Sequence, residues 1–441
     1  MSLTASVRAR HSGASLVETM VGILIGMIVI AVVYNILSVA EGYKRATVGS
    51  SDAQITGLLT QFMASRDISN GGNGIMMSTT QMNTTGAPVP SDLSNCANSG
   101  GGAPLLGLPI DALDNAARPI PVLITDGGGP GVSDEFISLS AGAAHVIWPV
   151  DVVFDAAAPL SVLPGQPITV QSPNGFTVPP PTPAAPHWAV AIGNNPPNSN
   201  CQVIRVVGAV PEPAPPLPAL PTGKVTLTQD PALATFFALT PNADPPRVLN
   251  LGPQGIATRI RYSVDQPNAV LRTTDLLTVN APVPVPIAQN VVLLKAQYGV
   301  DTDGNGIIDC WTPADASTCG DFSRDAVRGF TLAQINRILA VRIGVVVRSD
   351  EPDLRALTDP GNADLQAEAR ALRAGTRPPV VLFNCSTNNA ACQNRVVVPA
   401  ASGIPVGSPS CGAAVICDYW RYRTYETIVP LRNTIFAATI P

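Results

Sequence analysis

One acid, Glu18, stands near the head of an apolar run that continues through Val33. A carboxylate inside a membrane-length apolar helix costs roughly 2.5–3.5 kcal/mol on insertion scales, so it needs a partner. If the chain were cut after Gly13, Ala14 would become a cationic N-terminus four residues before Glu18. Such an amine on a neighbouring subunit could pair with the carboxylate. These residues therefore suggest an ion pair between the membrane helices of neighbouring subunits.

The residues around this segment set its orientation and leave other interpretations open. Arg8 and Arg10 hold the leader in the cytoplasm, which places the long C-terminal part outside. The alternatives are an ordinary signal anchor or a cleaved secretory signal peptide. A signal peptide has an apolar core of about 7–15 residues, whereas the present run is longer and contains an acid. We therefore expect a retained membrane helix.

A second run offers metal-binding oxygens at regular spacing. Asp301, Asp303 and Asn305 place side-chain oxygens at alternate positions. Gly306 permits a sharp turn, and Asp309 adds an oxygen at the ninth position. This spacing matches the start of an EF-hand calcium loop, but the bidentate Glu at the end of that loop is missing. The alternative is a turn rich in Asx and Gly residues without a metal. Calcium is the only cofactor that the sequence suggests.

The cysteines indicate a disulfide framework. All 8 lie in the part expected outside the cytoplasm, where an oxidising compartment favours disulfides. A structural metal site is the weaker alternative, because CxxC pairs are absent and His is scarce. Spacing suggests three local disulfides and one long-range one, among the many pairings possible. The suggested pairs are Cys310 with Cys319, Cys385 with Cys392, Cys411 with Cys417, and Cys96 with Cys201.

Composition narrows the class of protein. A net charge of −5 without a basic block argues against a nucleic-acid partner. Of the 3 His, His11 lies in the leader, and His145 and His187 lie in apolar or proline-rich surroundings. We find no HExxH, GxSxG, P-loop or dinucleotide-binding motif, and no pair of acids placed for acid–base work. The sequence therefore does not indicate an enzyme.

One long helix must position the N-terminal residues. The first proline is Pro88, so nothing breaks a helix from Ala14 to about Ile68. Its second half has apolar residues at helical spacing, and we expect this half to pack on the following domain. These apolar residues are Ile55, Leu58, Leu59, Phe62 and Met63. Gly22 and Gly26 form a GxxxG pair that could bring membrane helices close.

The remaining sequence is strand-like, with Val- and Ile-rich segments between proline and glycine turns. It lacks the regular βα alternation of a doubly wound parallel sheet. The predicted strands are Pro121–Thr125, Phe136–Leu139, Val146–Phe154, Gln202–Val210, Lys224–Thr228, Ile256–Val264, Val291–Tyr298, Val341–Arg348 and Tyr419–Val429. Short helices are predicted at Thr331–Leu339 and Asp364–Leu372. We interpret the proline-rich region Pro173–Pro221 as extended loops or an insertion on the sheet.

Two resemblances to known families rest on these residues. Gly13, Glu18 and the apolar run resemble the prepilin signal of type IV pilins and type II secretion pseudopilins. In that family a dedicated peptidase cuts after the glycine and methylates the new N-terminus. Three further stretches are similar to the PilW family of minor type IV pilins. They read LKAQYGVDTDGNGIID from Leu294, ILAVRIGVVVRSDE from Ile338 and WRYRTYETIVPLRN from Trp420.

The resemblance implies an α+β, pilin-like fold. A long N-terminal membrane-spanning helix would pack on a mainly antiparallel β-sheet domain that carries a large Pro-rich insertion. The implied leader is 1–13, and the helix is 14–68 with its membrane half at about 14–37. The β-rich periplasmic or extracellular domain would follow at 69–441, with the variable insertion at about 86–249.

The implied function is that of a PilW-like minor pilin, which helps to prime pilus assembly and forms part of the tip complex. The expected partners are the prepilin peptidase, other minor pilins, the major pilin and a tip adhesin. The protein would cross the inner membrane once and later lie in the extracellular pilus. The alternatives are a membrane-anchored binding or adhesion module, whose insertion contacts a surface, and a type II secretion pseudopilin.

Overall fold

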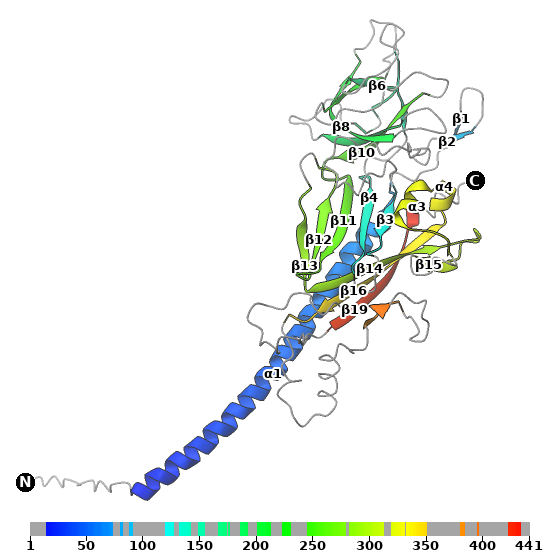
Figure 1. Cartoon of the computed structure of the whole chain (residues 1–441). Helices are drawn as coiled ribbons and strands as arrows, with labels where there is room; N and C mark the ends of the chain where they lie inside the picture. The colour runs from blue at the N-terminus through cyan, green and yellow to red at the C-terminus, as the bar shows by residue number, and fades with distance from the viewer. Residues whose placement is uncertain are drawn as a thin grey trace, which may run out of the picture.

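The chain folds into one long helix and several antiparallel sheets (Figure 1). The structure is a computed structural model. The residues that it describes are 15–73, 80–82, 88–90, 120–127, 132–142, 149–154, 166–173, 175–176, 186–192, 201–212, 223–230, 245–278, 282–312, 319–330, 332–350, 380–383, 395–396 and 422–433.

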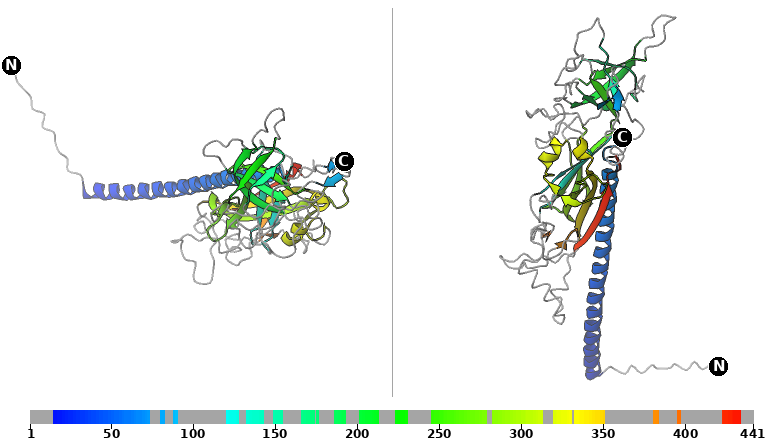
Figure 2. Two further views of the ribbon diagram at one scale, coloured as in Figure 1. Left: turned by 90° about the horizontal axis from the view of Figure 1, so that it is seen from above. Right: turned by 90° about the vertical axis from the view of Figure 1, so that its right-hand side faces the viewer.

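Helix α1 (Leu16–Ser69) has 54 residues and begins after the N-cap residue Ser15. At 1.5 Å per residue its length is about 80 Å. Its N-terminal half projects away from the sheets, and its C-terminal half lies along them (Figures 1 and 2). The predicted helix ends agree with the observed ones to within two residues, because no proline or cap intervenes earlier in the sequence.

Two sheets form the body against which α1 packs. The four-stranded sheet has the order β15-β14-β16-β19, and the five-stranded sheet has the order β13-β12-β11-β4-β3. The bounds in the first sheet are β14 (Val291–Val300), β15 (Cys310–Thr312), β16 (Ile338–Arg348) and β19 (Tyr422–Pro430). Those in the second sheet are β3 (Val122–Thr125), β4 (Glu135–Ser140), β11 (Thr258–Asp265), β12 (Val270–Asp275) and β13 (Val285–Gln289).

A single apolar core joins both sheets of the body to α1. Its buried members include Ala64 of the helix, Phe136 and Tyr262 of the five-stranded sheet, and Tyr298 and Ile343 of the four-stranded sheet. The ring centroids of Phe136 and Tyr262 lie 4.6 Å apart in a stacked pair. Because one cluster spans the three layers, we expect the body to unfold as one cooperative unit.

Buried polar groups fasten the two sheets where β3 and β4 meet β14. The Tyr298 hydroxyl accepts the Ile124 N–H at 2.7 Å and lies 3.1 Å from the Val122 carbonyl oxygen. Asp134, 2% exposed, accepts the Ala296 N–H at 2.9 Å and a bond from Lys295 Nζ at 2.7 Å. Burial raises the pKa of Asp134 to about 6, although Lys295 and the backbone N–H groups act in the opposite direction.

A third sheet, of six strands, lies beyond the body at the end opposite the N-terminus of α1 (Figures 1 and 2). Its order is β5-β10-β7-β8-β9-β6, and every pairing between these strands is antiparallel. The bounds are β5 (Val150–Asp151), β6 (Ile168–Val170), β7 (His187–Ile192), β8 (Cys201–Pro211), β9 (Val225–Gln229) and β10 (Arg247–Pro253).

The two edge strands of this sheet bond to each other. The Val153 N–H donates to the Thr169 carbonyl at 2.8 Å, and the Gln171 N–H donates to the Asp151 carbonyl at 3.1 Å. Val152 and Val170 pair between these two bonds. The six strands therefore close into an antiparallel barrel, which leaves no open sheet edge.

The remaining elements are short. They are α3 (Arg324–Gly329), α4 (Leu332–Ile335), the strand pair β1 (Thr80–Met82) and β2 (Pro88–Pro90), and the strand pair β17 (Val380–Val381) and β18 (Arg395–Val396). The pair of β1 and β2 lies beside the six-stranded barrel (Figure 1). The predicted helix Thr331–Leu339 is wrong at its C-terminal end, because strand β16 already begins at Ile338. The predicted helix Asp364–Leu372 lies outside the described residues.

The predicted fold class is confirmed. A long apolar N-terminal helix is followed by sheets in which all pairings between named strands are antiparallel. Each predicted strand overlaps an observed one, although only Val150–Asp151 of Val146–Phe154 forms a named strand. The sequence analysis predicted no strand at β1, β2, β6, β7, β10, β12, β13, β15, β17 or β18.

Candidate functional sites: the N-terminal helix and the acidic loop

Glu18 lies in the first turn of α1 and is exposed. The apolar segment Leu16–Glu41 that follows is long and apolar enough to cross a membrane, and none of it is buried against the body. The unpaired N–H groups at a helix N-terminus attract an acidic side chain, so the position of Glu18 is favourable within its own helix. Gly13 and Ala14 lie outside the described residues. Cleavage between them and the pairing of the new amine with Glu18 therefore stay predictions.

The face by which α1 packs on the body consists of small residues up to Ala64 and ends at the buried Ile68, and sequence reasoning missed it. Ala53, Thr60 and Ala64 are at most 3% exposed and follow one side of the helix together with Gly57. A Cβ placed on Gly57 would lie 2.6 Å from Cζ of Tyr425 on β19, and closer still to Cδ2 and Cε2. The absence of a side chain at Gly57 thus lets the tyrosine ring lie directly on the helix backbone.

The predicted packing face of this half of the helix is wrong. Four of the five predicted residues, Ile55, Leu58, Leu59 and Phe62, are 62%, 52%, 47% and 66% exposed, although their helical spacing suggested that they pack on the domain. The fifth, Met63, is partly buried. The signal that marks the true face is the run of small residues at positions 53, 57, 60 and 64, which has the same spacing as a helix face. The second half of α1 therefore carries two faces, a small-residue face on the body and a large apolar face directed outward.

Polar contacts fix the C-terminal end of α1. The Gln61 side chain donates to the Glu426 carbonyl at 2.6 Å, which satisfies a backbone acceptor of strand β19. The Tyr262 hydroxyl donates to Asp67 Oδ2 at 2.6 Å, and the Ser138 hydroxyl donates to the Asp67 carbonyl at 2.5 Å. Burial and the bond to Asp67 raise the pKa of Tyr262. These bonds tie the helix to both sheets of the body.

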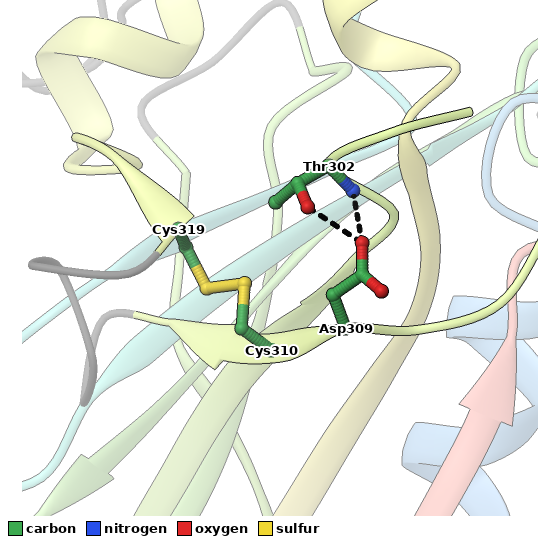
Figure 3. Close-up of a disulfide and its surroundings, with 4 residues drawn as sticks. All are labelled: Thr302, Asp309, Cys310 and Cys319. Atoms are coloured by element: carbon green, nitrogen blue, oxygen red, sulfur yellow. Dashed lines mark hydrogen bonds between the residues drawn. A yellow bond between two sulfur atoms is a disulfide. The ribbon is translucent and has the colours of Figure 1, made fainter. Parts of the chain in front are cut away.

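The acidic loop connects β14 to β15. Asp301 folds the loop around its carboxylate, which accepts the N–H groups of Gly304 and Gly306 at 2.6 and 2.7 Å. Burial acts to raise the pKa of Asp301, but these N–H groups outweigh it and lower the pKa below its usual range. Asp309 Oδ2 accepts two bonds from Thr302, at 2.7 Å from the amide and 2.6 Å from the hydroxyl (Figure 3). These two bonds lower the pKa of Asp309.

The same loop brings together the predicted calcium ligands. Carboxylate oxygens of Asp301, Asp303 and Asp309 all lie within 4.8 Å of one another. Asn305 uses its side-chain oxygen to accept the Ile307 N–H at 2.8 Å, which is the bond of an Asx turn. Three carboxylates on one loop suit a hard cation such as Ca²⁺, and the backbone bonds alone also suffice for a metal-free turn. Calcium binding therefore stays a prediction.

A disulfide joins Cys310 at the end of this loop to Cys319, with a Cα–Cα distance of 5.9 Å (Figure 3). This is the local pair that the cysteine spacing suggested. The bond closes a short segment next to the acidic loop and anchors β15. Cys201 begins strand β8, but its side chain is not described. The other cysteines of the suggested pairs, Cys96, Cys385, Cys392, Cys411 and Cys417, lie outside the described residues.

Comparison with known families identifies the larger part of the body. Residues 260–433 match the family model of Type IV Pilus-assembly protein W, PilW. This part of the chain, somewhat less than half of its length, is similar to the PilW family. The PilW region runs from β11 through β19 and contains the acidic loop, the disulfide and the three stretches whose resemblance the sequence suggested. The predicted resemblance to PilW is confirmed.

Two further comparisons add little to the PilW match. No curated protein matches the chain. Among solved structures, a type IV-like pilin from Thermus thermophilus is similar at 12% sequence identity, over 56% of this chain and 84% of that one, with a TM-score of 0.20. A likeness this distant carries no argument about function.

Proposed function

We propose that this PilW-like protein is a minor pilin, held in the inner membrane by α1 until it enters a type IV pilus. Helix α1 carries the proposal. Its first half is apolar and free of the body, with Glu18 in its first turn. Its second half docks on the body by small residues and directs Ile55, Leu58 and Phe62 outward. A helix with these two halves can leave the membrane and pack among neighbouring helices without unfolding the body.

In this proposal each part of the helix has a separate task. The prepilin peptidase cuts after Gly13, and the amine of Ala14 on one subunit pairs with Glu18 of a neighbour. The outward apolar face of the second half meets the helices of other minor pilins and of the major pilin. The body primes assembly and lies in the tip complex, where a tip adhesin is a candidate neighbour. The similarity to PilW supports pilus components as the class of partner.

Mass spectrometry of the N-terminal peptide, from membranes and from sheared pili, tests this proposal. A peptide that begins at N-methylated Ala14, recovered from both fractions, is the expected result. An intact N-terminus in cells with an active peptidase would contradict it, and a cleaved chain found only in membranes would favour a type II secretion pseudopilin.

The barrel supports a second candidate function, that of a membrane-anchored binding module, because it lies at the end of the molecule farthest from the membrane half of α1 (Figure 1).

A further inference from the structure

The six-stranded barrel is inserted into a β-hairpin of the body. Strands β4 and β11 pair directly, and Ser140 faces Thr258 as the last pair of their ladder. The two hydroxyl groups lie 2.9 Å apart. The chain therefore leaves the body at Ser140 and returns beside the same residue, with the whole barrel in between. An insertion with adjacent ends leaves the host fold topologically intact.

The barrel has its own core. Buried residues from all six strands form one cluster in its interior, separate from the core of the body. They include Ile168, Ile204 and Leu227, each 0% exposed. A smaller cluster, which we call the junction, packs the outer face of β7 and β10 on the body, with Trp188 against Leu139 and Leu277 among its members. The contacts that hold the barrel on the body therefore belong to the junction, and they are separate from the residues that form the core of the barrel.

We infer that residues 141–257 form an independently folded barrel domain, and that pilus assembly is the task of α1 and the body without the barrel. The second half of this inference rests on the proposed function. The most extensive contacts of α1 with named strands are all with the body, through β19, β16, β13 and β4. The PilW match begins at residue 260, immediately after the barrel. The barrel lies at the end of the molecule opposite the N-terminus of α1, beyond the part of the helix that packs on the body (Figure 2).

The proposed boundaries differ from the insertion of about 86–249 expected from the sequence. Strands β3 and β4 fall inside that range, yet β4 pairs with β11 and β3 pairs with β4, so both belong to the body. The insertion also extends past 249, because β10 runs to Pro253 and the ladder of β11 starts at Thr258. The sequence predicted β3 and β4 as strands, but not the pairing with β11 that assigns them to the body.

Hydrogen exchange on the full-length protein tests independent folding. Leu227→Ala opens a cavity in the barrel core and should lower the protection of amides in β7 to β9 by about 30-fold or more. Amides of β14 and β16 should keep wild-type protection. The matched variant Ile343→Ala, in the body core, should give the reverse pattern, because Ile343 is also 0% exposed. An equal loss in both regions from either variant would overturn the inference, since it would make the molecule one cooperative unit.

Excision of the barrel tests the division of labour. Residues 141–257 are replaced by Asn-Gly, which closes Ser140 and Thr258 into a two-residue hairpin. A second version also carries Leu139→Thr and Leu277→Gln, so that the exposed junction does not cause aggregation. We expect both chains to form the disulfide between Cys310 and Cys319 and to reach sheared pili at no less than half the wild-type amount.

Two results would contradict this inference. Loss of the disulfide or degradation of both excised chains would show that the body needs the barrel to fold. A folded, cleaved chain that stays in the membrane would show that the barrel takes part in assembly. If the wild-type protein were itself absent from pili, the proposed function would fail, whereas the hydrogen-exchange result would still decide whether the barrel is a separate domain.

Discussion

Gly57 is the position where a single methyl group should disturb the contact between helix and body most. Alanine is normally the better residue in a helix interior, by about 0.5–1 kcal/mol. In Gly57→Ala, however, the new Cβ would lie 2.6 Å from Cζ of Tyr425, with two other ring atoms closer. Carbon atoms prefer a separation of about 3.5–4.0 Å, so the ring or the helix must shift by roughly 1 Å.

The cost of that shift decides the sign of the effect. Overpacking a filled site costs about 1–3 kcal/mol, which exceeds the gain in helix propensity. The expected net loss is therefore about 1–2 kcal/mol in the free energy of unfolding, and the corresponding fall in Tm is roughly 2–8 °C. In the Tyr425→Ala background the obstacle is gone, so Gly57→Ala should stabilise the helix by about 0.5–1 kcal/mol.

The assay is thermal unfolding of the full-length protein in detergent, for the two single variants and the double variant. Gly26→Ala is the control, because nothing lies within 4 Å of a Cβ at Gly26. We expect Gly26→Ala to change the free energy of unfolding of the body by no more than about 0.5 kcal/mol, with a correspondingly small change in Tm. A Gly57→Ala protein that is more stable than wild type, by the same amount with and without the Tyr425 ring, would refute the close approach of helix and strand.

Four further predictions address assembly, pH and metal. Glu18→Ala should leave cleavage intact and lower incorporation into pili, and normal incorporation would count against its pairing role. Phe62→Ser should change the free energy of unfolding by less than about 0.5 kcal/mol, because the side chain is exposed, yet reduce incorporation. Asp134 has a native pKa raised to about 6. Its contribution to stability is therefore complete below the unfolded pKa of about 4 and is lost as pH rises through 6, by at most about 3 kcal/mol. Asp134→Asn should flatten that part of the Tm–pH profile, and an unchanged slope would refute it. Asp301→Ala combined with Asp303→Ala should lower the Tm only when Ca²⁺ is present, and an equal loss with chelator would indicate a plain turn.

The long helix could be predicted from the sequence, but its packing face could not. The absence of proline before Pro88 permits one uninterrupted helix, and the sequence Asn70-Gly-Gly that follows it marks the C-terminal end, where Asn70 is the observed C-cap. The packing face failed because large apolar residues at helical spacing indicate an apolar neighbour, not which neighbour it is. On this helix the body takes the side of Gly57 and Thr60, where the backbone can approach closely, and Phe62 is left to face outward.

The barrel was concealed by a different feature of the sequence. Strand β7 is buried at all six positions, so it lacks the alternation that marks a strand with one wet face. Strand β6 has only three residues, and β7 lies in the proline-rich region Pro173–Pro221 that suggested loops. Pairing between strands far apart in the chain, such as Ser140 with Thr258, leaves no local pattern, and only the folded chain reveals it.

For the acidic loop, the sequence predicts which residues lie together but not whether they bind a cation. The spacing of Asp301, Asp303 and Asp309 correctly places three carboxylates together, because the glycine-rich turn forces the chain back on itself. Yet each of these acids already has backbone or hydroxyl donors, so the same geometry satisfies a turn and prepares a cation site. The spacing of residues determines which groups lie close together. Whether the carboxylates keep their internal hydrogen-bond donors or bind a cation depends on the free energies of the two states, which the spacing does not give.

The two faces of α1 indicate that the helix first docks on the body and then packs against neighbouring helices, while the barrel takes no part in either step. The small-residue face must be filled by the body before assembly, since Tyr425 and Asp67 hold the helix there in the monomer. The apolar face with Ile55 and Phe62 stays uncovered in the monomer, so it is available for neighbouring helices without any rearrangement. The barrel is connected to the body at the paired ends of β4 and β11. By our inference, its gain, loss or replacement leaves both faces of α1 unchanged. A chain built this way can vary what it presents outward while the surfaces that enter the fibre remain the same.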